Sequence, residues 1–148
     1  MMFAMFFAAA GNLRATQIER LEGKYLKSRI KLRIDENWKV RTGNAAGAEA
    51  TGFDDAGWAT ISVPHDMSIT LVSTTNSDPG ALGWYRKHFN VPAAWSGKRI
   101  NLEFDGVFQV AEIFVNGQRI GEHKGGYTGF TFDITGAVKT GDNVVAVF

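Results

Sequence analysis

The stretch "AEIFVNGQRIGEH", residues 111–123, decides the fold class. Two runs of alternating apolar and polar residues flank the dipeptide Asn116-Gly117. A two-residue type I′ turn needs positive φ at both central positions, and Asn-Gly is the pair that adopts this conformation most readily. The stretch therefore predicts a β-hairpin in which one face of each strand is turned toward a core.

The same two-residue period recurs on both sides of this hairpin. In the run that precedes it, Ile100, Leu102 and Phe104 alternate with polar residues. Further strands are predicted at residues 29–35, 37–40, 58–63, 84–91, 99–107, 129–135 and 143–148. Some connections are short and others are long and glycine-rich, among them a surface loop predicted at residues 41–57. Strands do not alternate with helices. This pattern predicts an all-β fold, an antiparallel jelly-roll β-sandwich.

Residues 1–28 form a separate N-terminal extension ahead of the sandwich at residues 29–148. Thr16 and Glu19 have the spacing of a capping box, which predicts a short helix over residues 16–28. The apolar run at residues 1–11 is similar to the core of a signal peptide but lacks the positive charges that precede such cores. We expect it to pack on this chain or on a neighbouring subunit. The compartment, cytoplasmic or periplasmic/secreted, stays open.

Length and composition exclude several function classes. The chain has 148 residues, which suits one domain, and 45% of them are apolar. A net charge of +1 gives no general case for binding nucleic acid. The absence of cysteine excludes disulfides and thiolate metal sites, and no apolar run is long enough for a membrane helix. The three histidines are widely spaced, so no metal site and no cofactor is predicted.

Several sequence blocks together resemble a known family. They are "FDDAGWATISVPHDMSI", "GWYRKHFNVP", "GKRINLEFDGVFQVAEIFVNGQRIGEHKGGYTGFTFDIT" and "GDNVVAVF". In this order they resemble the N-terminal, galactose-binding-like jelly roll of glycoside hydrolase family two, from about Leu32 to Phe148. That family includes β-galactosidases, β-glucuronidases and β-mannosidases. The resemblance implies a carbohydrate partner, with a galactoside-type sugar as one possibility.

The resemblance does not carry the family's activity to these residues. In the family, an immunoglobulin-like domain and a TIM barrel follow this domain, and the barrel supplies two catalytic glutamates. Neither is in this sequence, nor is the family's Arg-Val-Asp-Asn-like segment after the last strand. We expect a sandwich without its last strand or strands to leave an open sheet edge. Open edges recruit other strands, which predicts a homo-oligomer formed through that edge or through the N-terminal extension.

The catalytic residues are unknown from the sequence, with Glu103, Asp105 and Glu112 as candidates. Residues two apart on a strand share a face and lie roughly 6.5–7 Å apart, and Glu112 on the next strand is a candidate to lie opposite Glu103 and Asp105 and complete a carboxylate cluster. Two carboxylates at about 5–5.5 Å or 6.5–9.5 Å are what retaining or inverting glycosidases use. The alternative is that these acids are solvated or paired with nearby cationic side chains.

Four residues at the ends of predicted strands are candidates for sugar binding, two after a strand and two at the start of one. His65 and Asp66 follow a proline at a strand end, where they are able to hydrogen-bond hydroxyl groups. Trp84 and Tyr85 offer aromatic surface for a pyranose ring. The alternatives are that His65 locks its loop, that Trp84 packs in the core, and that Tyr85 forms a hydrogen bond across the sandwich.

The stretch "HKGGYTGFTFDIT", residues 123–135, adds His123 and Tyr127 to the candidates for sugar binding. Gly125 and Gly126 permit positive φ or a close approach of another segment. The stretch is either a sharp corner between two strands or a loop that faces a sugar.

Three hypotheses remain open from the sequence. The chain is a non-catalytic module that binds carbohydrate or supports assembly, a small stand-alone glycosidase that uses the three acids, or a structural remnant without a ligand. Nucleic acid and membrane are not expected as partners.

Overall fold

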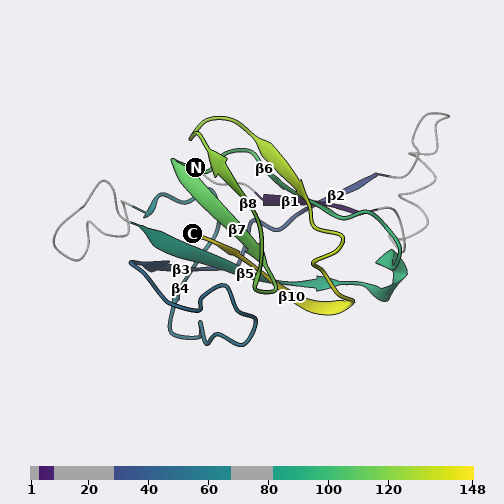
Figure 1. The fold of residues 1–148 in the computed structure, drawn as a ribbon, viewed down its shortest axis with the longest axis horizontal. Helices are drawn as coiled ribbons and strands as arrows, with labels where there is room; N and C mark the ends of the chain where they lie inside the picture. The colour runs from purple at the N-terminus through teal and green to yellow at the C-terminus, as the bar shows by residue number, and fades with distance from the viewer. Residues whose placement is uncertain (1–3, 9–28, 68–81) are drawn as a thin grey trace.

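The computed structural model describes the backbone of residues 4–8 and describes residues 29–67 and 82–148 in full. The strands form two antiparallel sheets that face each other (Figure 1). The four-stranded sheet has the order β2-β1-β6-β9, and the six-stranded sheet has the order β4-β3-β5-β10-β7-β8. The all-β sandwich predicted from the sequence is confirmed, whereas the helix expected over residues 16–28 lies outside the described residues.

The four-stranded sheet contains β1 (Ala4–Ala8), β2 (Ile30–Arg33), β6 (Asn101–Phe104) and β9 (Phe130–Asp133). The six-stranded sheet contains β3 (Trp38–Thr42), β4 (Ala59–Ile61), β5 (Gly83–Val91), β7 (Val110–Val115), β8 (Gln118–Lys124) and β10 (Gly141–Val147). A single 3₁₀ turn, η1 (Ala93–Trp95), follows β5.

The hairpin that decides the fold class is β7–β8. Val115 is paired with Gln118, so Asn116 and Gly117 are the two loop residues. Their φ angles are 52° and 84°, both positive as a type I′ turn requires. Asn-Gly therefore determines this turn locally.

The main core lies between the sheets. Leu102 and Phe104 of β6 are fully buried on the side of the four-stranded sheet. Ile113 of β7 and Val145 and Val147 of β10 pack in the same core from the six-stranded sheet. The alternation read from residues 99–107 thus gives the inner face correctly, because side chains on a strand point to opposite faces in turn.

The N-terminal apolar segment and the last strand both have interior places. β1 pairs with β2 on one side and β6 on the other, and β10 lies between β5 and β7. Among the described residues neither β10 nor β1 is therefore an edge strand, and the edges are β2, β9, β4 and β8. The absence of a further strand from the sandwich stays a prediction. Neither the last strand nor the N-terminal segment supports the predicted homo-oligomer, which stays a prediction.

A second apolar cluster covers the outer face of the six-stranded sheet. Trp84 and Ala146 point to this face, and Ala45, Ala48 and Trp58 from the segment between β3 and β4 pack against them. The sequence predicts a surface loop for residues 41–57, and the structure instead gives it buried positions. We call residues 43–58 the covering loop.

Arg86 fastens the covering loop to the sheet. Its side chain is fully buried, and its Nε donates to Asp55 Oδ2 over 2.8 Å. Its two terminal nitrogens donate to the backbone carbonyls of Ala48, Ala50 and Phe53. One guanidinium thus satisfies three loop carbonyls and one carboxylate, which is the arrangement that a buried charge requires.

The charge of Asp55 gives the protein an acid-sensitive contact. Burial alone raises the pKa of Asp55, but hydrogen bonds from Arg86 and from His88, whose Nε2 is 2.9 Å from Oδ2, outweigh it. The pKa in the folded state is therefore below its usual value of 3.8.

We predict that the stability lost in Asp55→Asn depends on pH. A carboxyl with a lowered folded-state pKa stabilises the fold above its unfolded pKa, and this contribution disappears as pH falls through the folded value. The difference in unfolding free energy between wild type and Asp55→Asn should be full at pH 5–7 and shrink below about pH 4. Urea denaturation at each pH measures it, with the exposed neighbour Asp54→Asn as control. A difference that is constant from pH 7 to 3 would contradict the prediction.

Candidate functional site

Most of the candidate residues gather at one end of the sandwich. Tyr85, Val147, Ile113 and Gly121 are consecutive partners across the six-stranded sheet, so β5 begins where β8 ends. The loops that meet there are residues 64–67, 82–85, 105–110 and 124–129. We call this the loop end, which lies toward the left in Figure 1.

His65 and Tyr85 form a pair at the loop end. His65 Nδ1 and the Tyr85 hydroxyl oxygen are 2.9 Å apart, within hydrogen-bond distance, and the rings meet edge to face at 5.8 Å. Asp66 is exposed beside them. From the sequence, His65 either hydrogen-bonds a hydroxyl group of a ligand or locks its loop. In both roles the contact with Tyr85 fixes the orientation of the imidazole ring.

The protonation of this pair follows from its burial. Burial lowers the pKa of His65, and the charge of Asp66 opposes this only in part. Burial also raises the pKa of Tyr85, and Asp66 adds to that shift. At neutral pH the imidazole and the phenol are therefore both uncharged, so each offers both a donor and an acceptor.

Gly83 allows the segment that carries His65 to approach β5. A Cβ at this position would lie 2.3 Å from the sulfur of Met67 and 2.8 Å from the carbonyl oxygen of Arg41. The absence of a side chain therefore brings residues 64–67 against the start of β5.

The glycine-rich stretch forms a corner that carries exposed aromatic surface. Gly125 has a φ of 128°, and a Cβ on Gly126 would lie 2.3 Å from the Phe108 ring. Tyr127 is 92% exposed, with its ring centroid 6.0 Å from that of Phe108, which is itself 55% exposed. The stretch is thus a corner, and its aromatic side chains face outward.

His123 is held within that corner. Its ring stacks on Phe130 with centroids 4.0 Å apart, and its Nε2 is 3.2 Å from Thr128 Oγ1. The two histidine sites are not adjacent. His65 is bonded to Tyr85 on β5 and His123 lies on β8, and these two strands are three strand spacings, about 14 Å, apart.

Trp84 is not available as a sugar platform. It is only 5% exposed, and its ring packs on Phe148 at 4.7 Å and on Phe114 at 5.8 Å. One alternative from the sequence is that Trp84 packs in the core and Tyr85 forms a hydrogen bond. The pair follows this alternative, except that Trp84 packs on the outer face of the six-stranded sheet rather than between the sheets.

The three candidate acids do not form a cluster. Glu103 lies on β6 in the four-stranded sheet and accepts a bond from Lys31 over 2.9 Å, whereas Asp105 is exposed after that strand. Glu112 lies on β7 in the other sheet. Glu103 and Glu112 both point outward, so they are on opposite faces of the sandwich. The expectation that Glu112 sits beside the other two is wrong.

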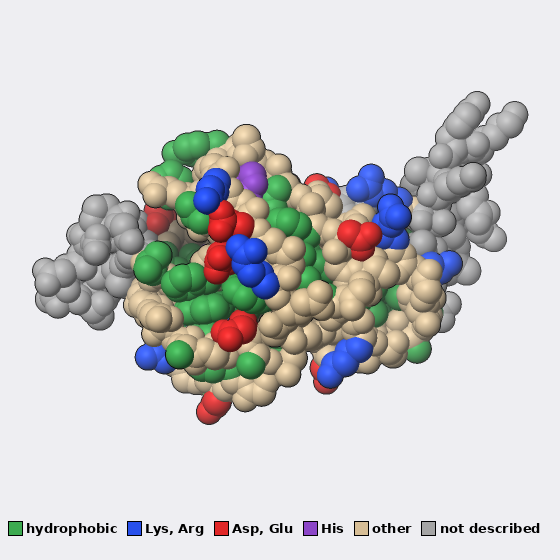
Figure 2. Space-filling model, in the orientation of Figure 1, with side chains coloured by type: hydrophobic (Ala, Val, Ile, Leu, Met, Phe, Trp, Pro, Cys, Tyr) green, Lys and Arg blue, Asp and Glu red, His purple; other side chains and the backbone are tan. Residues whose placement is uncertain are grey.

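Glu112 belongs instead to a row of ion pairs. Arg119 Nη2 is 2.9 Å from Glu112 and 3.3 Å from Glu122, whose other oxygen is 2.8 Å from Lys124 Nζ. Figure 2 shows these acidic and basic side chains alternating over β7 and β8. Such exposed ion pairs fit the alternative that the candidate acids are paired with nearby cationic side chains.

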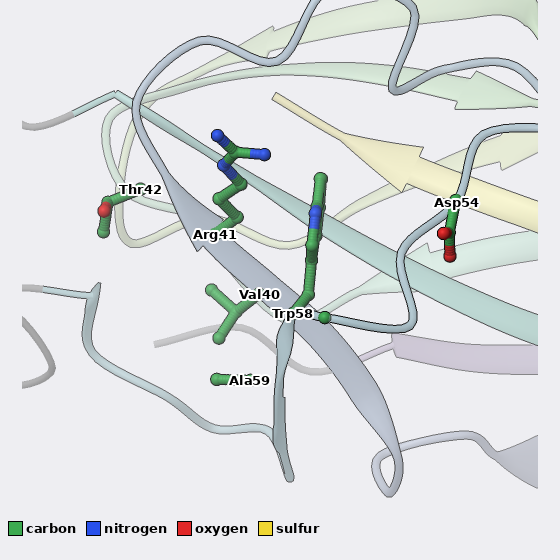
Figure 3. A pocket seen from close by; sticks show the side chains of 7 residues that line it. Val40, Arg41, Thr42, Asp54, Trp58 and Ala59 are labelled. Atoms are coloured by element: carbon green, nitrogen blue, oxygen red, sulfur yellow. The ribbon is translucent and has the colours of Figure 1, made fainter.

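A pocket that the sequence did not indicate lies at the edge of the six-stranded sheet (Figure 3). Its volume is about 500 Å³. The residues that line it come from β3, β4 and the covering loop: Val40, Arg41, Thr42, Asp54, Gly57, Trp58 and Ala59. Sequence reasoning missed it because residues 40–42 and 54–59 are brought together by the pairing of β3 with β4 and by the folding of the covering loop.

Two kinds of feature are absent from the described part of the chain. No group of three or more histidine, aspartate or glutamate side chains there has the geometry to hold a metal ion. No helix in that part has the length and apolar character needed to cross a membrane.

Comparisons with known proteins agree with this architecture. The family described as "Glycosyl hydrolases family 2, sugar binding domain" matches residues 18–148. A β-galactosidase of Thermoanaerobacter pseudethanolicus is 37% identical over 119 residues, which are 78% of this chain and 16% of that protein. A β-glucuronidase of Bacteroides fragilis is 48% identical over 110 residues, 74% of this chain and 15% of that protein.

Solved structures give the same picture. A family 2 glycosyl hydrolase from Bacteroides cellulosilyticus has a TM-score of 0.71 and 42% identity, covering 77% of this chain and 16% of that chain. The β-glucuronidase of Bacteroides uniformis has a TM-score of 0.67 and 33% identity, covering 77% and 14%. The chain thus spans only about one sixth of the length of these relatives.

Proposed function

This chain belongs to family 2 of the glycosyl hydrolases, as the sugar-binding domain of that family, and from this membership we propose that its loop end contacts a β-glycoside. The relatives are named β-galactosidases and β-glucuronidases, so β-galactosides are the first ligand class to test. The observation that carries the proposal is the fixed His65–Tyr85 pair beside the exposed Asp66.

Each of the three residues has a distinct role in this proposal. The Asp66 carboxylate accepts hydrogen bonds from sugar hydroxyls, which are strong because the acceptor is charged. Tyr85 holds the neutral His65 ring in one orientation, so that the ring meets a hydroxyl without first being ordered. Positioning groups in advance in this way reduces the free-energy cost of binding.

The aromatic corner is a second contact for the same ligand. Tyr127 and Phe108 expose ring surface at the loop end, and such surface packs on the apolar face of a pyranose. The corner lies far enough from His65 that an oligosaccharide or a glycoside with a large aglycone would be needed to touch both. His123 supports the corner from behind through Phe130 and Thr128.

The proposal assigns no bond cleavage to the described residues. A retaining glycosidase needs two carboxylates about 5–5.5 Å apart, whereas Glu103 and Glu112 are on opposite faces and each has a cationic partner. The hypothesis of a stand-alone glycosidase has no support from this arrangement. In our proposal, the domain shapes and holds one part of a sugar site whose acids come from other residues.

We predict that Asp66→Ala weakens sugar binding about tenfold or more. Loss of a hydrogen bond to a charged acceptor costs roughly 1.5–3 kcal/mol, and 1.4 kcal/mol corresponds to a factor of ten. Calorimetric titration of the 148-residue protein with methyl β-D-galactopyranoside measures the change.

The matched control is Asp142→Ala, since Asp142 is an exposed aspartate at the opposite end of β10. Equal affinity of Asp66→Ala and wild type would overturn the assignment of this site. Turnover of a nitrophenyl β-galactoside that follows the protein through purification would overturn the non-catalytic role.

A further inference from the structure

The pocket at the sheet edge has the composition of a sugar site. Its volume of about 500 Å³ lies within the roughly 300–1,000 Å³ typical of small-molecule sites. Val40, Trp58 and Ala59 supply apolar wall, and Arg41, Thr42 and Asp54 supply polar groups. Such a mixture matches a pyranose, which has apolar C–H faces and a rim of hydroxyl groups.

Two donors in the pocket are unused within the described chain. No hydrogen bond from the Arg41 guanidinium or from the Trp58 indole N–H to any described residue is present, although Trp58 is only 8% exposed. By contrast, the indole N–H of Trp38 donates to the carbonyl of Ile34 over 2.7 Å. The Trp58 N–H is not one of the buried polar atoms shut off from water, so an acceptor bound in the pocket would take the place of water as its partner.

The polar groups are placed to read hydroxyl groups. In Figure 3 the side chains of Arg41 and Trp58 extend in the same direction, and Asp54 projects from the covering loop beyond the indole ring. Arg41 and Trp58 are donors, whereas the Asp54 carboxylate is an acceptor that, within the described residues, receives the N–H of Ala56 over 2.9 Å. A sugar hydroxyl both donates and accepts, so it is able to satisfy both kinds of group.

The covering loop makes the pocket a built feature. Asp55, next to Asp54, is bound by the buried Arg86, and Trp58 packs edge to face on Phe53 with centroids 5.5 Å apart. Asp54 and Trp58 are therefore both positioned by contacts within the covering loop and with the sheet. Binding in such a site orders few side chains, which favours affinity.

We propose that this pocket is a second carbohydrate site of the domain, which takes one neutral hexopyranose residue. Arg41 and Trp58 donate to the sugar, Asp54 accepts from its hydroxyls, and Thr42 does either. The charges of Arg41 and Asp54 are opposite and offset each other, which suits a neutral sugar better than a charged uronate. This inference extends the proposed carbohydrate function but uses none of the residues assigned to the loop end.

The test follows the indole N–H signals of the ¹⁵N-labelled protein during titration with methyl β-D-galactopyranoside. The chain has four tryptophans, and Trp38 serves as the internal reference because its N–H is already bonded. We expect the Trp58 signal to shift in a saturable way and the Trp38 signal to stay unmoved. Methyl β-D-glucuronide should bind more weakly, and stronger binding of the glucuronide would overturn the ligand class.

Variants separate this site from the loop end. Arg41→Gln should weaken the Trp58 response about tenfold, whereas Asp66→Ala should leave it unchanged. Arg99→Gln, which removes another exposed arginine, is the control. Asp54→Asn provides a second variant that keeps an oxygen for the N–H of Ala56 and should also weaken binding.

The two proposals fail in different ways. A Trp58 signal that never moves, while other signals shift in an Asp66-dependent manner, overturns the second site and leaves the loop end intact. A Trp58 response that is equal in Arg41→Gln and wild type also overturns it. A saturable Trp58 response without any Asp66-dependent binding supports the second site and overturns the loop end.

Discussion

Arg86→Met is expected to lower the unfolding free energy by about 3–5 kcal/mol, because it removes one partner from a buried ion pair. The Asp55 carboxylate would lose its fully buried partner, and three backbone carbonyls of the covering loop would lose their donor. Methionine fills much of the volume of the arginine stem, so the loss reports on hydrogen bonds and charge rather than on a cavity.

Urea denaturation and thermal melting measure this effect. For a chain of this size each kcal/mol lowers the melting temperature by roughly 2–4 °C, so a decrease on the order of 10 °C is expected. Arg119→Met is the matched control, since its ion pairs are exposed and each should contribute about 1 kcal/mol or less. Equal stability of Arg86→Met and Arg119→Met would show that the covering loop does not depend on the guanidinium.

Loss of Arg86 also has a functional consequence. The covering loop carries Asp54 and Trp58, so its release from the sheet should remove the edge pocket as well. The His65–Tyr85 pair packs on the inner side of β5 and should persist. Binding that depends on Asp66 should therefore survive in Arg86→Met at a temperature where the variant is still folded.

Asn143→Leu is expected to destabilise the protein by a similar amount, about 3–5 kcal/mol. Asn143 is 1% exposed, and its Nδ2 donates to the carbonyls of Lys139 and Gly141, each over 2.7 Å. Its Oδ1 accepts from the Lys139 N–H and from Asn116 Nδ2, each over 2.8 Å. Leucine has a similar volume but leaves these buried groups unpaired, at roughly 1–3 kcal/mol for each group that water cannot reach.

The same change should loosen the hairpin that decides the fold class. Asn116, which forms that turn, also accepts from the Val144 N–H and donates to the carbonyl of Ala137. Asn143 thus connects the β7–β8 turn to the start of β10. Amide hydrogen exchange at Asn116 and Val144 should accelerate in Asn143→Leu, while Asn90→Leu, at an exposed position on β5, should leave both unchanged. Unchanged exchange in Asn143→Leu would refute this connection.

The features that the sequence predicted well depend on neighbouring residues. Asn116-Gly117 specifies its turn because the required φ angles are a property of the two residues themselves. The alternation around Leu102 and Phe104 gives the buried face because the direction of side chains on a strand is local. The resemblance to a sugar-binding domain of glycoside hydrolase family two has the same basis, since it depends on short blocks in a fixed order, and the family match confirms it.

The features that were wrong or missed depend on which strands become neighbours. Glu103 and Glu112 are nine positions apart, yet β6 and β7 belong to different sheets, so proximity along the chain did not give proximity in space. From the sequence, Trp84 lies on a strand that has one face toward solvent. The covering loop packs on that face and buries the side chain. The apolar run that contains β1 is predicted to pack on this chain or on a neighbouring subunit, but nothing local predicts its insertion between β2 and β6.

The sequence by itself determined the all-β class, the hairpin, the inner face of the sandwich and the carbohydrate family, because turn geometry, strand period and motif order are encoded over a few residues. Only the tertiary structure decided that His65 meets Tyr85, that Arg86 holds the covering loop, and that Arg41, Asp54 and Trp58 line one pocket. These arrangements bring together residues 13 to 38 positions apart and depend on burial against the whole sheet, which no local pattern records.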